Sequence, residues 1–416
     1  MTTFAVSPQA VLRKVVRRTA RLVEGPAARL LPLDASDLLK GALRKARVRE
    51  VEDSAFLEGL GRLVRSLEEE ARLNLFGRIA VREDIMRLLA NRFRVERDRR
   101  RDPAIAEEEI RRPIFITGLP RSGSTLLHGL LAQDPANRVP QTWEMLDPSP
   151  CPRRETYERD KRIRKTEREL RWLDRLVPEF RKIHAVGARL PEECVILLAH
   201  SFVSSQFCSM YVVPSYQRWV EEQDLVPAYR LHRRFLQHLQ RHCRGERWVL
   251  KAPAHLPTLR ELFQVYPDAS IIMTHREPLE VLGSEASLHT VLRRAFSDAI
   301  DPKAVGREVS ELTAKEIRIG LAARDDGCAP SDQFFDLLYP DLVRDPIGAV
   351  RAIYAHFDLA FTPAAEAGMR RYLTTNPKDE HGSHDYSLAQ FGLDLEEERH
   401  RYEDYRARFL SDSSLR

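Results

Sequence analysis

The chain carries two hydrophobic patterns, one typical of helices and one typical of buried strands. Up to about residue 110, leucine, isoleucine and phenylalanine recur every three or four positions between charged residues, most clearly over residues 54–75 and 79–93. This spacing predicts amphipathic helices. The charged run at residues 97–103, which ends in proline, is interpreted as a linker. We therefore expect residues 1–110 to form a helical N-terminal region, with packing or homo-oligomerisation as its role.

After residue 110, short apolar runs alternate with helical patterns. Such runs occur at residues 114–117, 247–251, 270–274 and 334–339. Strands that alternate with helices predict a parallel sheet flanked by helices, an α/β fold that here covers residues 111–416. Ligands of such sheets bind beyond the carboxyl ends of the strands. Arg121, Lys251 and Arg276 follow three of the predicted strands, so the fold should gather three cations around one crevice.

The first predicted strand leads into a loop suited to an anion. Residues 118–125, Gly-Leu-Pro-Arg-Ser-Gly-Ser-Thr, precede a helix with leucines on one face. Glycines allow the tight bend, and the unpaired amides of a helix's first turn attract a phosphate or similar anion. The two glycines and Thr125 match the P-loop pattern GxxxxGK[ST], but Ser124 replaces the lysine. A P-loop-like sheet is therefore predicted, while the missing lysine argues against an ATPase or kinase.

A second anion site is predicted after the third strand. Arg276 directly follows the strand, and Ser284 lies eight residues later on the next helix, so a guanidinium and a hydroxyl can share one phosphate. Together the segments PRSGST and HREPLEVLGSE resemble the two cofactor-binding signatures of the sulfotransferases that use 3′-phosphoadenosine 5′-phosphosulfate (PAPS). The resemblance covers roughly residues 111–390.

This resemblance implies the residues that hold the cofactor. In that family the first loop binds the 5′-phosphosulfate, and the arginine and serine of the second segment bind the 3′-phosphate. A late basic loop often closes over the cofactor, which implies Lys378 as a further cofactor contact and His384 as an acceptor contact. The first loop contributes the following positions here: Pro120, Arg121, Ser122, Gly123, Ser124 and Thr125.

The resemblance also implies in-line, metal-independent sulfuryl transfer to a hydroxyl or amine. Arg121, Lys251 and the loop amides would stabilise the leaving phosphate. Protein-tyrosine and carbohydrate sulfotransferases and their bacterial relatives, which this loop resembles, use a glutamate some twenty residues after the loop as base. Glu144, 23 residues after Arg121, is the matching carboxylate. His255 is the alternative base, as in the cytosolic branch, or a contact to acceptor or cofactor.

Composition excludes some functions and leaves others open. A net charge of +5 gives no general basic field for nucleic acid, and no apolar run is long enough to span a membrane. Five scattered cysteines suit a reducing, cytoplasmic compartment without a metal site. A small-molecule kinase with a degenerate phosphate loop and a non-catalytic nucleotide-binding protein remain as alternatives. The acceptor is open among lipid, glycan, phenol and peptide; Glu192 and Glu193 could face it, or cap a helix.

Overall fold

The computed structural model describes residues 31–51, 53–176, 187–376 and 387–410. Within them, a parallel sheet has the strand order β2-β3-β1-β4-β5. The predicted α/β fold is confirmed, and the four predicted strands are present; the additional edge strand β2 has only two residues. The strand bounds are β1 (Ile114–Gly118), β2 (Asn137–Arg138), β3 (Arg247–Lys251), β4 (Ser270–His275) and β5 (Phe334–Leu338).

Strand β1 lies at the centre of the sheet and all five of its residues are buried. Its side chains alternate between two cores: Phe115 belongs to one, and Ile114 and Ile116 to the other. A strand covered on both faces reads as a continuous apolar run, which is why it was predictable. In register, Ile116 pairs with Lys251 and Gly118 with Thr274. The carboxyl ends of β1, β3 and β4 therefore meet at one edge.

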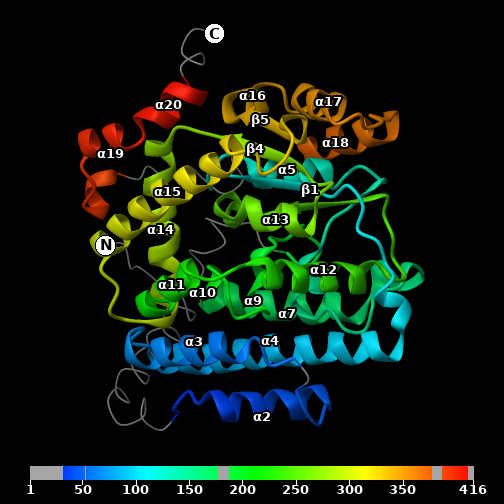
Figure 1. Cartoon of the computed structure of the whole chain (residues 1–416), viewed down its shortest axis with the longest axis vertical. Coiled ribbons are helices and arrows are strands. Elements are labelled where there is room, and N and C mark those ends of the chain that lie inside the picture. The colour runs from blue at the N-terminus through cyan, green and yellow to red at the C-terminus, as the bar shows by residue number, and fades with distance from the viewer. Residues whose placement is uncertain (1–30, 52, 177–186, 377–386, 411–416) are drawn as a thin grey trace, which may run out of the picture.

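Helices cover both faces of the sheet (Figure 1). The face on the side of Ile114 packs against α5 (Ser124–Leu131), α16 (Tyr339–Arg344), α17 (Pro346–His356) and α18 (Pro363–Thr375). The other face packs against α12 (Val226–Gln240), α13 (Leu259–Val265), α14 (Pro278–Phe296) and α15 (Pro302–Asp325). Near the C-terminus, the short helix α20 (Glu403–Phe409) adds to the second group, and the short helix α19 (Leu395–Arg401) contacts α14.

The N-terminal helices form a layer at the end of the molecule opposite the sheet (Figure 1). They are α2 (Ala35–Ala46), α3 (Leu57–Glu69) and α4 (Leu75–Arg101). They share one hydrophobic core with residues 199–220 and with Phe296 of α14. Helices α2, α3 and α4 lie within the region predicted to be helical, and their core is continuous with later parts of the chain.

The linker expected at residues 97–103 is instead mostly helix, because α4 continues to Arg101. Its arginines make tertiary contacts: Arg97 donates to the carbonyl of Ala46 at 2.9 Å, and Arg99 donates to the side chain of Gln237 at 3.0 Å. These partners are distant in sequence, so a charged run resembled a linker although it is the packed end of a long helix.

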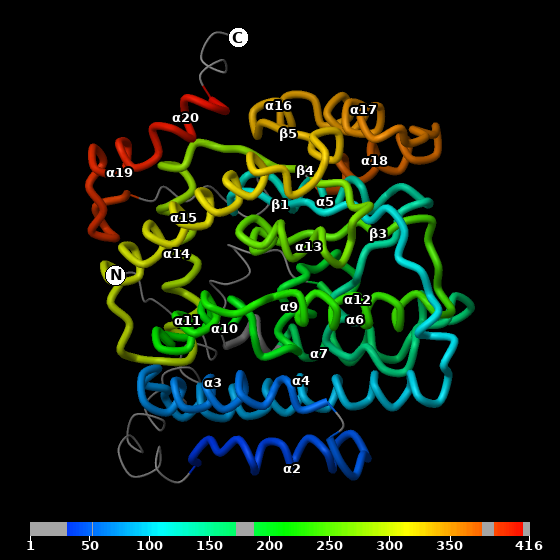
Figure 2. Tube along the Cα trace, in the orientation of Figure 1, coloured from blue at the N-terminus to red at the C-terminus, as the bar shows by residue number. Residues whose placement is uncertain are grey.

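A long insertion between β2 and β3 fills the space between the sheet and the N-terminal layer (Figure 2). Its described helices are α6 (Thr142–Leu146), α7 (Lys161–Leu176), α9 (Val195–Ala199), α10 (Gln206–Met210) and α11 (Pro214–Glu221), followed by α12. This insertion provides one wall of the cavity described below. Across the described ranges, each helix is too short or too polar to cross a bilayer.

Candidate functional site

The loop between β1 and α5 has a backbone that only a few residue types adopt easily. Gly118 and Gly123 have φ values of 122° and 84°, and Arg121 adopts a left-handed φ of 60°. A Cβ on Gly118 would lie 2.2 Å from the carbonyl oxygen of Thr274 on β4, so glycine is required there for close packing of loop and sheet. The result is a tight turn that brings the first turn of α5, with its unpaired amides, to the edge of the sheet.

Ser122 holds this turn together from the inside. Its side chain is fully buried and its hydroxyl donates to the carbonyl of Leu119, with a further hydrogen bond of 2.6 Å to the hydroxyl of Thr274. The predicted cofactor contact is thus a loop-shaping residue in this structure. Its loop neighbours open onto a cavity, which is lined by Pro120, Arg121, Gly123, Ser124 and Thr125.

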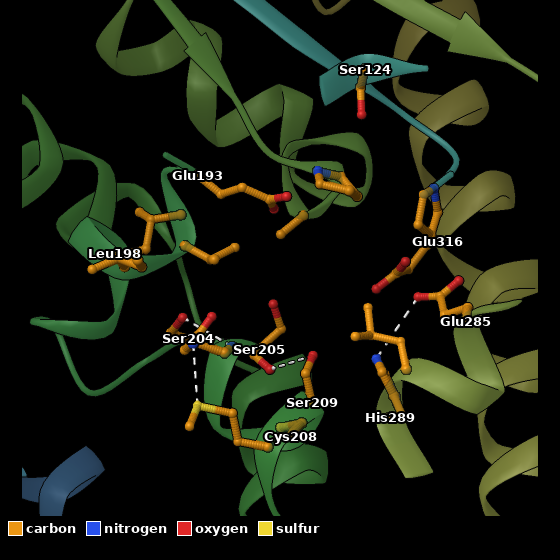
Figure 3. Close-up of a pocket in the computed structure, with 18 of the residues that line it drawn as sticks. Ser124, Glu193, Leu198, Ser204, Ser205, Cys208, Ser209, Glu285, His289 and Glu316 are labelled. Atoms are coloured by element: carbon orange, nitrogen blue, oxygen red, sulfur yellow. Dashed lines mark hydrogen bonds and ion pairs between the residues drawn. The ribbon is translucent and has the colours of Figure 1, made fainter. Parts of the chain in front are cut away.

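That cavity has a volume of about 1270 Å³ and extends from the loop into the space between the insertion and the long helices α14 and α15. In Figure 3, Ser124 points into it from one end, Glu193 from one side, and Glu285 and Glu316 from the opposite side. Away from the loop its wall has a mainly apolar surface, but it also carries Ser204, Ser209, Glu285, His289 and Glu316; the apolar side chains include Leu198, Met210, Val220, Leu288, Leu292 and Ile319. The cavity therefore joins a cationic end to a mainly apolar chamber with a few polar groups on its wall.

The structure brings the three predicted cations to the same edge of the sheet. Arg276 donates to the carbonyl of Arg121 at 2.8 Å, and its guanidinium lies 4.3 Å from the centre of the Tyr339 ring. Lys251 lies behind the lining, 3% exposed, with its Nζ atom 3.4 Å from the hydroxyl of Thr125 and in an ion pair with Glu193. Arg121 and Arg276 line the cavity directly.

Glu144 is not brought to this cavity. Its side chain is completely buried and forms an ion pair with Arg138. Tyr157 donates to it at 2.8 Å and the amide of Gln141 at 3.0 Å, the latter closing a capping box at the start of α6. Both carboxylate oxygens are occupied inside the protein. In this arrangement the carboxylate predicted as the base is engaged in structural contacts.

His255 lies in the core beside the central strand and does not line the cavity. Its Nδ1 atom is 2.7 Å from the hydroxyl of Tyr229, and its ring packs edge-on against Phe115. Burial, reinforced by His232, lowers the pKa of His255 well below its ordinary value, so it stays neutral. Ser284 is partly buried on α14, outside the cavity lining. Lys378 and His384 lie outside the described residues.

Sequence reasoning missed three polar groups on the far wall. Glu285 and His289 lie one turn apart on α14, with 3.9 Å between their side chains, and Glu316 comes from α15. Burial and the neighbouring Glu316 raise the pKa of Glu285 to about 8, against the opposing effect of Arg121. Burial likewise raises the pKa of Glu316 to about 7 and lowers that of His289 to about 3. The spacing of Glu285 and His289 was the only sequence signal, and it does not identify Glu316.

The raised pKa of Glu285 predicts that the contribution of this carboxyl group to stability falls as the pH rises. The unfolded Glu285 releases its proton near an ordinary glutamate pKa, whereas the folded form keeps it until about pH 8. The protonated form is thus favoured by folding, and its contribution is complete at acidic pH and is lost as pH rises toward 8. The melting temperature of Glu285→Gln relative to the wild type should therefore increase between about pH 5 and about pH 8, because only the wild type loses this contribution.

The matched control is Glu311→Gln, which changes an exposed glutamate on α15. Its melting curve should follow that of the wild type across the same pH range. A Glu285→Gln profile parallel to the wild type would contradict the shifted pKa.

Comparisons with known proteins give consistent results. A family model described as "Sulfotransferase family" matches residues 113–363. A sulfotransferase from Mycobacterium bovis, named omega-hydroxy-beta-dihydromenaquinone-9 sulfotransferase Stf3, is 27% identical over 305 residues, 68% of this chain and 71% of that protein. The crystal structure of STF1 from Mycobacterium tuberculosis H37Rv covers 90% of this chain and 99% of its own, with 31% identity and a TM-score of 0.80. STF9 from Mycobacterium avium covers 90% and 96%, with 28% identity and a TM-score of 0.80.

Proposed function

Because the chain belongs to the sulfotransferase family, we propose that it transfers the sulfuryl group of PAPS to the hydroxyl of an apolar acceptor. The observation that carries this proposal is a single cavity with an anion-binding loop and two arginines at one end and an apolar chamber at the other. One end suits a multiply charged donor and the other an apolar molecule. Their junction lies beside Ser124, Thr125 and Glu193.

The residues at the loop fit the anionic groups of the donor. The first-turn amides of α5 and the hydroxyls of Ser124 and Thr125 present hydrogen-bond donors to a phosphosulfate. Arg276 is held by the carbonyl of Arg121, by the Tyr339 ring and by an ion pair with Glu280 at 2.9 Å. A guanidinium has five N–H donors, so donors remain for a 3′-phosphate. PAPS, when bound, would supply the sulfuryl group and a leaving phosphate.

Lys251 would stabilise the leaving group. It emerges at the carboxyl end of β3 and its Nζ atom lies 3.4 Å from Thr125 Oγ1, in the first turn of α5. The ammonium group would stabilise the negative charge that develops on the bridging oxygen. Because this group is nearly buried, the interaction is stronger than it would be in water.

The acceptor class follows from the chamber. A cavity of about 1270 Å³ exceeds the upper end, about 1,000 Å³, of common small-molecule pockets, and its deeper wall is mainly apolar. The curated relative is named for a hydroxylated menaquinone derivative, a lipid. We therefore propose an extended apolar alcohol, with its hydroxyl at the loop and its apolar body in the chamber.

The donor assignment is tested by nucleotide-induced stabilisation. Adenosine 3′,5′-bisphosphate should raise the melting temperature, because a ligand that binds only the folded state stabilises it. Arg276→Ala removes a charge-assisted phosphate contact worth about 2 kcal/mol, so the dissociation constant should rise about thirtyfold. Scanning fluorimetry and calorimetric titration measure the two effects.

Two comparisons make this result specific. AMP, which lacks the 3′-phosphate, should stabilise the wild type much less. Arg344→Ala, a change at an exposed arginine of α16 that pairs with Asp341, should leave the affinity unchanged. Equal stabilisation by AMP would exclude the assigned 3′-phosphate contact, and a preference for ATP with Mg²⁺ would favour a kinase.

A further inference from the structure

We propose that Glu193 is the general base that takes the proton from the acceptor hydroxyl, and that Lys251 positions it. This inference rests on the proposed sulfuryl transfer. It assigns the proton-transfer step to Glu193 instead of Glu144, the carboxylate predicted from the sequence. Three observations carry it: how the backbone of Glu193 is held, where its side chain points, and why neighbouring titratable groups of the cavity are weaker proton acceptors.

The backbone at Glu193 is anchored to the catalytic edge of the sheet. The amide of Cys194 donates to the carbonyl of Lys251 at 2.9 Å, and the amide of Glu192 donates to the carbonyl of Pro140 at 3.0 Å. These two hydrogen bonds, from the residues on either side of Glu193, hold this segment against the carboxyl end of β3 and against the chain just after β2. Glu193 has little freedom to leave the site, as a precise proton acceptor requires.

The side chain of Glu193 extends from this anchor into the cavity. It is 20% exposed and lines the same space into which Ser124 points (Figure 3). It lies at the junction between the loop and the apolar chamber. An alcohol whose apolar body fills the chamber would present its hydroxyl beside this carboxylate. A general base needs the hydroxyl within hydrogen-bond reach for direct proton transfer.

Lys251 links the base to the donor end. Its ammonium pairs with Glu193 and lies 3.4 Å from Thr125 Oγ1 in the first turn of α5. An ammonium has three N–H donors, so it can hold Glu193 and also meet an anion at the loop. As negative charge develops on the leaving oxygen, it competes with Glu193 for the lysine. This weakens the hold on the carboxylate at the moment when proton uptake is needed.

Glu192, Glu285 and His289, which also line the cavity, are less able to accept the acceptor proton. Glu192 Oε1 accepts from the amide of Glu193 at 2.9 Å, and its other oxygen accepts from Thr142 at 3.4 Å. Burial raises the pKa of Glu285 to about 8, so this group is largely protonated at neutral pH. The pKa of His289, lowered by burial to about 3, makes it a weak proton acceptor.

In the assigned step, a lone pair of the acceptor oxygen forms a bond to sulfur as the bond between sulfur and the bridging phosphate oxygen breaks. The electron pair of the broken bond stays on the phosphate, which leaves as adenosine 3′,5′-bisphosphate next to Lys251. The acceptor proton moves to Glu193, which later releases it to solvent. The products are a sulfate ester and the bisphosphate, and no oxidant or reductant takes part.

Comparing the transfer rates to two acceptors distinguishes a general base from a merely structural residue. A primary fatty alcohol in detergent micelles needs its proton removed, whereas 4-nitrophenol at mildly alkaline pH is already largely ionised. Glu193→Gln should lower transfer to the alcohol about a hundredfold and leave transfer to 4-nitrophenolate nearly unchanged. Hydrolysis of PAPS, in which water is the acceptor, should fall with the alcohol reaction. Mass spectrometry reads all three products.

Glu192→Gln is the matched control, since it makes the same chemical change one residue away. It should keep the wild-type ratio of alcohol to phenolate transfer. The inference is overturned if Glu193→Gln slows both acceptors equally, if it slows neither, or if Glu192→Gln selectively loses the alcohol reaction. A wild type that neither binds adenosine 3′,5′-bisphosphate nor hydrolyses PAPS would instead overturn the proposed function.

Discussion

Lys251→Met should lower the rate of sulfuryl transfer by up to about a thousandfold, the upper range for removing one donor to a developing negative charge. Methionine keeps the unbranched, apolar stem that emerges at the carboxyl end of β3, so the fold should be retained. The charge next to Thr125 is lost, and Glu193 loses the partner that directs it toward the loop. Binding of adenosine 3′,5′-bisphosphate should change much less than turnover, because the effect falls mainly on the transition state.

The matched variant is Lys251→Arg, which keeps the charge and should retain more activity than methionine. A double variant, Lys251→Met with Glu193→Gln, should lose less than the product of the two single effects, because the residues act as a unit. Turnover and circular dichroism on the same preparations separate catalysis from folding. Normal turnover of Lys251→Met would remove the lysine from the mechanism.

Glu144→Gln should lower the free energy of unfolding by about 3 kcal/mol or more, a typical cost of breaking a buried ion pair. The glutamine cannot balance the charge of Arg138, which is buried with it. Its amide also replaces an oxygen that accepts hydrogen bonds at the start of α6. Urea unfolding followed by circular dichroism measures the loss, and turnover per folded molecule should remain within a fewfold of the wild type.

The control for this change is an exposed ion pair. Glu158→Gln removes a surface partner of Arg189 and should cost less than about 1 kcal/mol. A Glu144→Gln protein that is as stable as the wild type but inactive would restore Glu144 as the base. Stability loss with preserved turnover would identify it as a structural carboxylate.

The strands and the anion-binding loop were predictable because their causes are local. Strand β1 is buried on both faces and reads as an unbroken apolar run, and the glycines of the loop mark positions where the backbone needs them. The end of α4 was not predictable, because the partners of Arg97 and Arg99 lie far away in sequence.

The carboxylates illustrate a second limit. The number of residues between the loop and Glu144 identified this glutamate as the expected base, but such a spacing does not say which way a side chain points. A capping box turns Glu144 inward to Arg138. Glu192 and Glu193 are neighbours in sequence, yet one bonds to Thr142 and the other to Lys251. These directions depend on tertiary contacts that no local pattern encodes.

The order of strands also has a consequence for how the chain reaches its native state. Strand β1 comes early, but its two neighbours are β3 and β4, which begin at residues 247 and 270. During translation, β1 and the glycine loop therefore emerge from the ribosome long before the strands that pair with β1 have been synthesised. Closing such long loops costs entropy before the contacts form, which slows folding. In the nascent chain, an apolar strand with both edges open must be kept from aggregating until translation has passed β4.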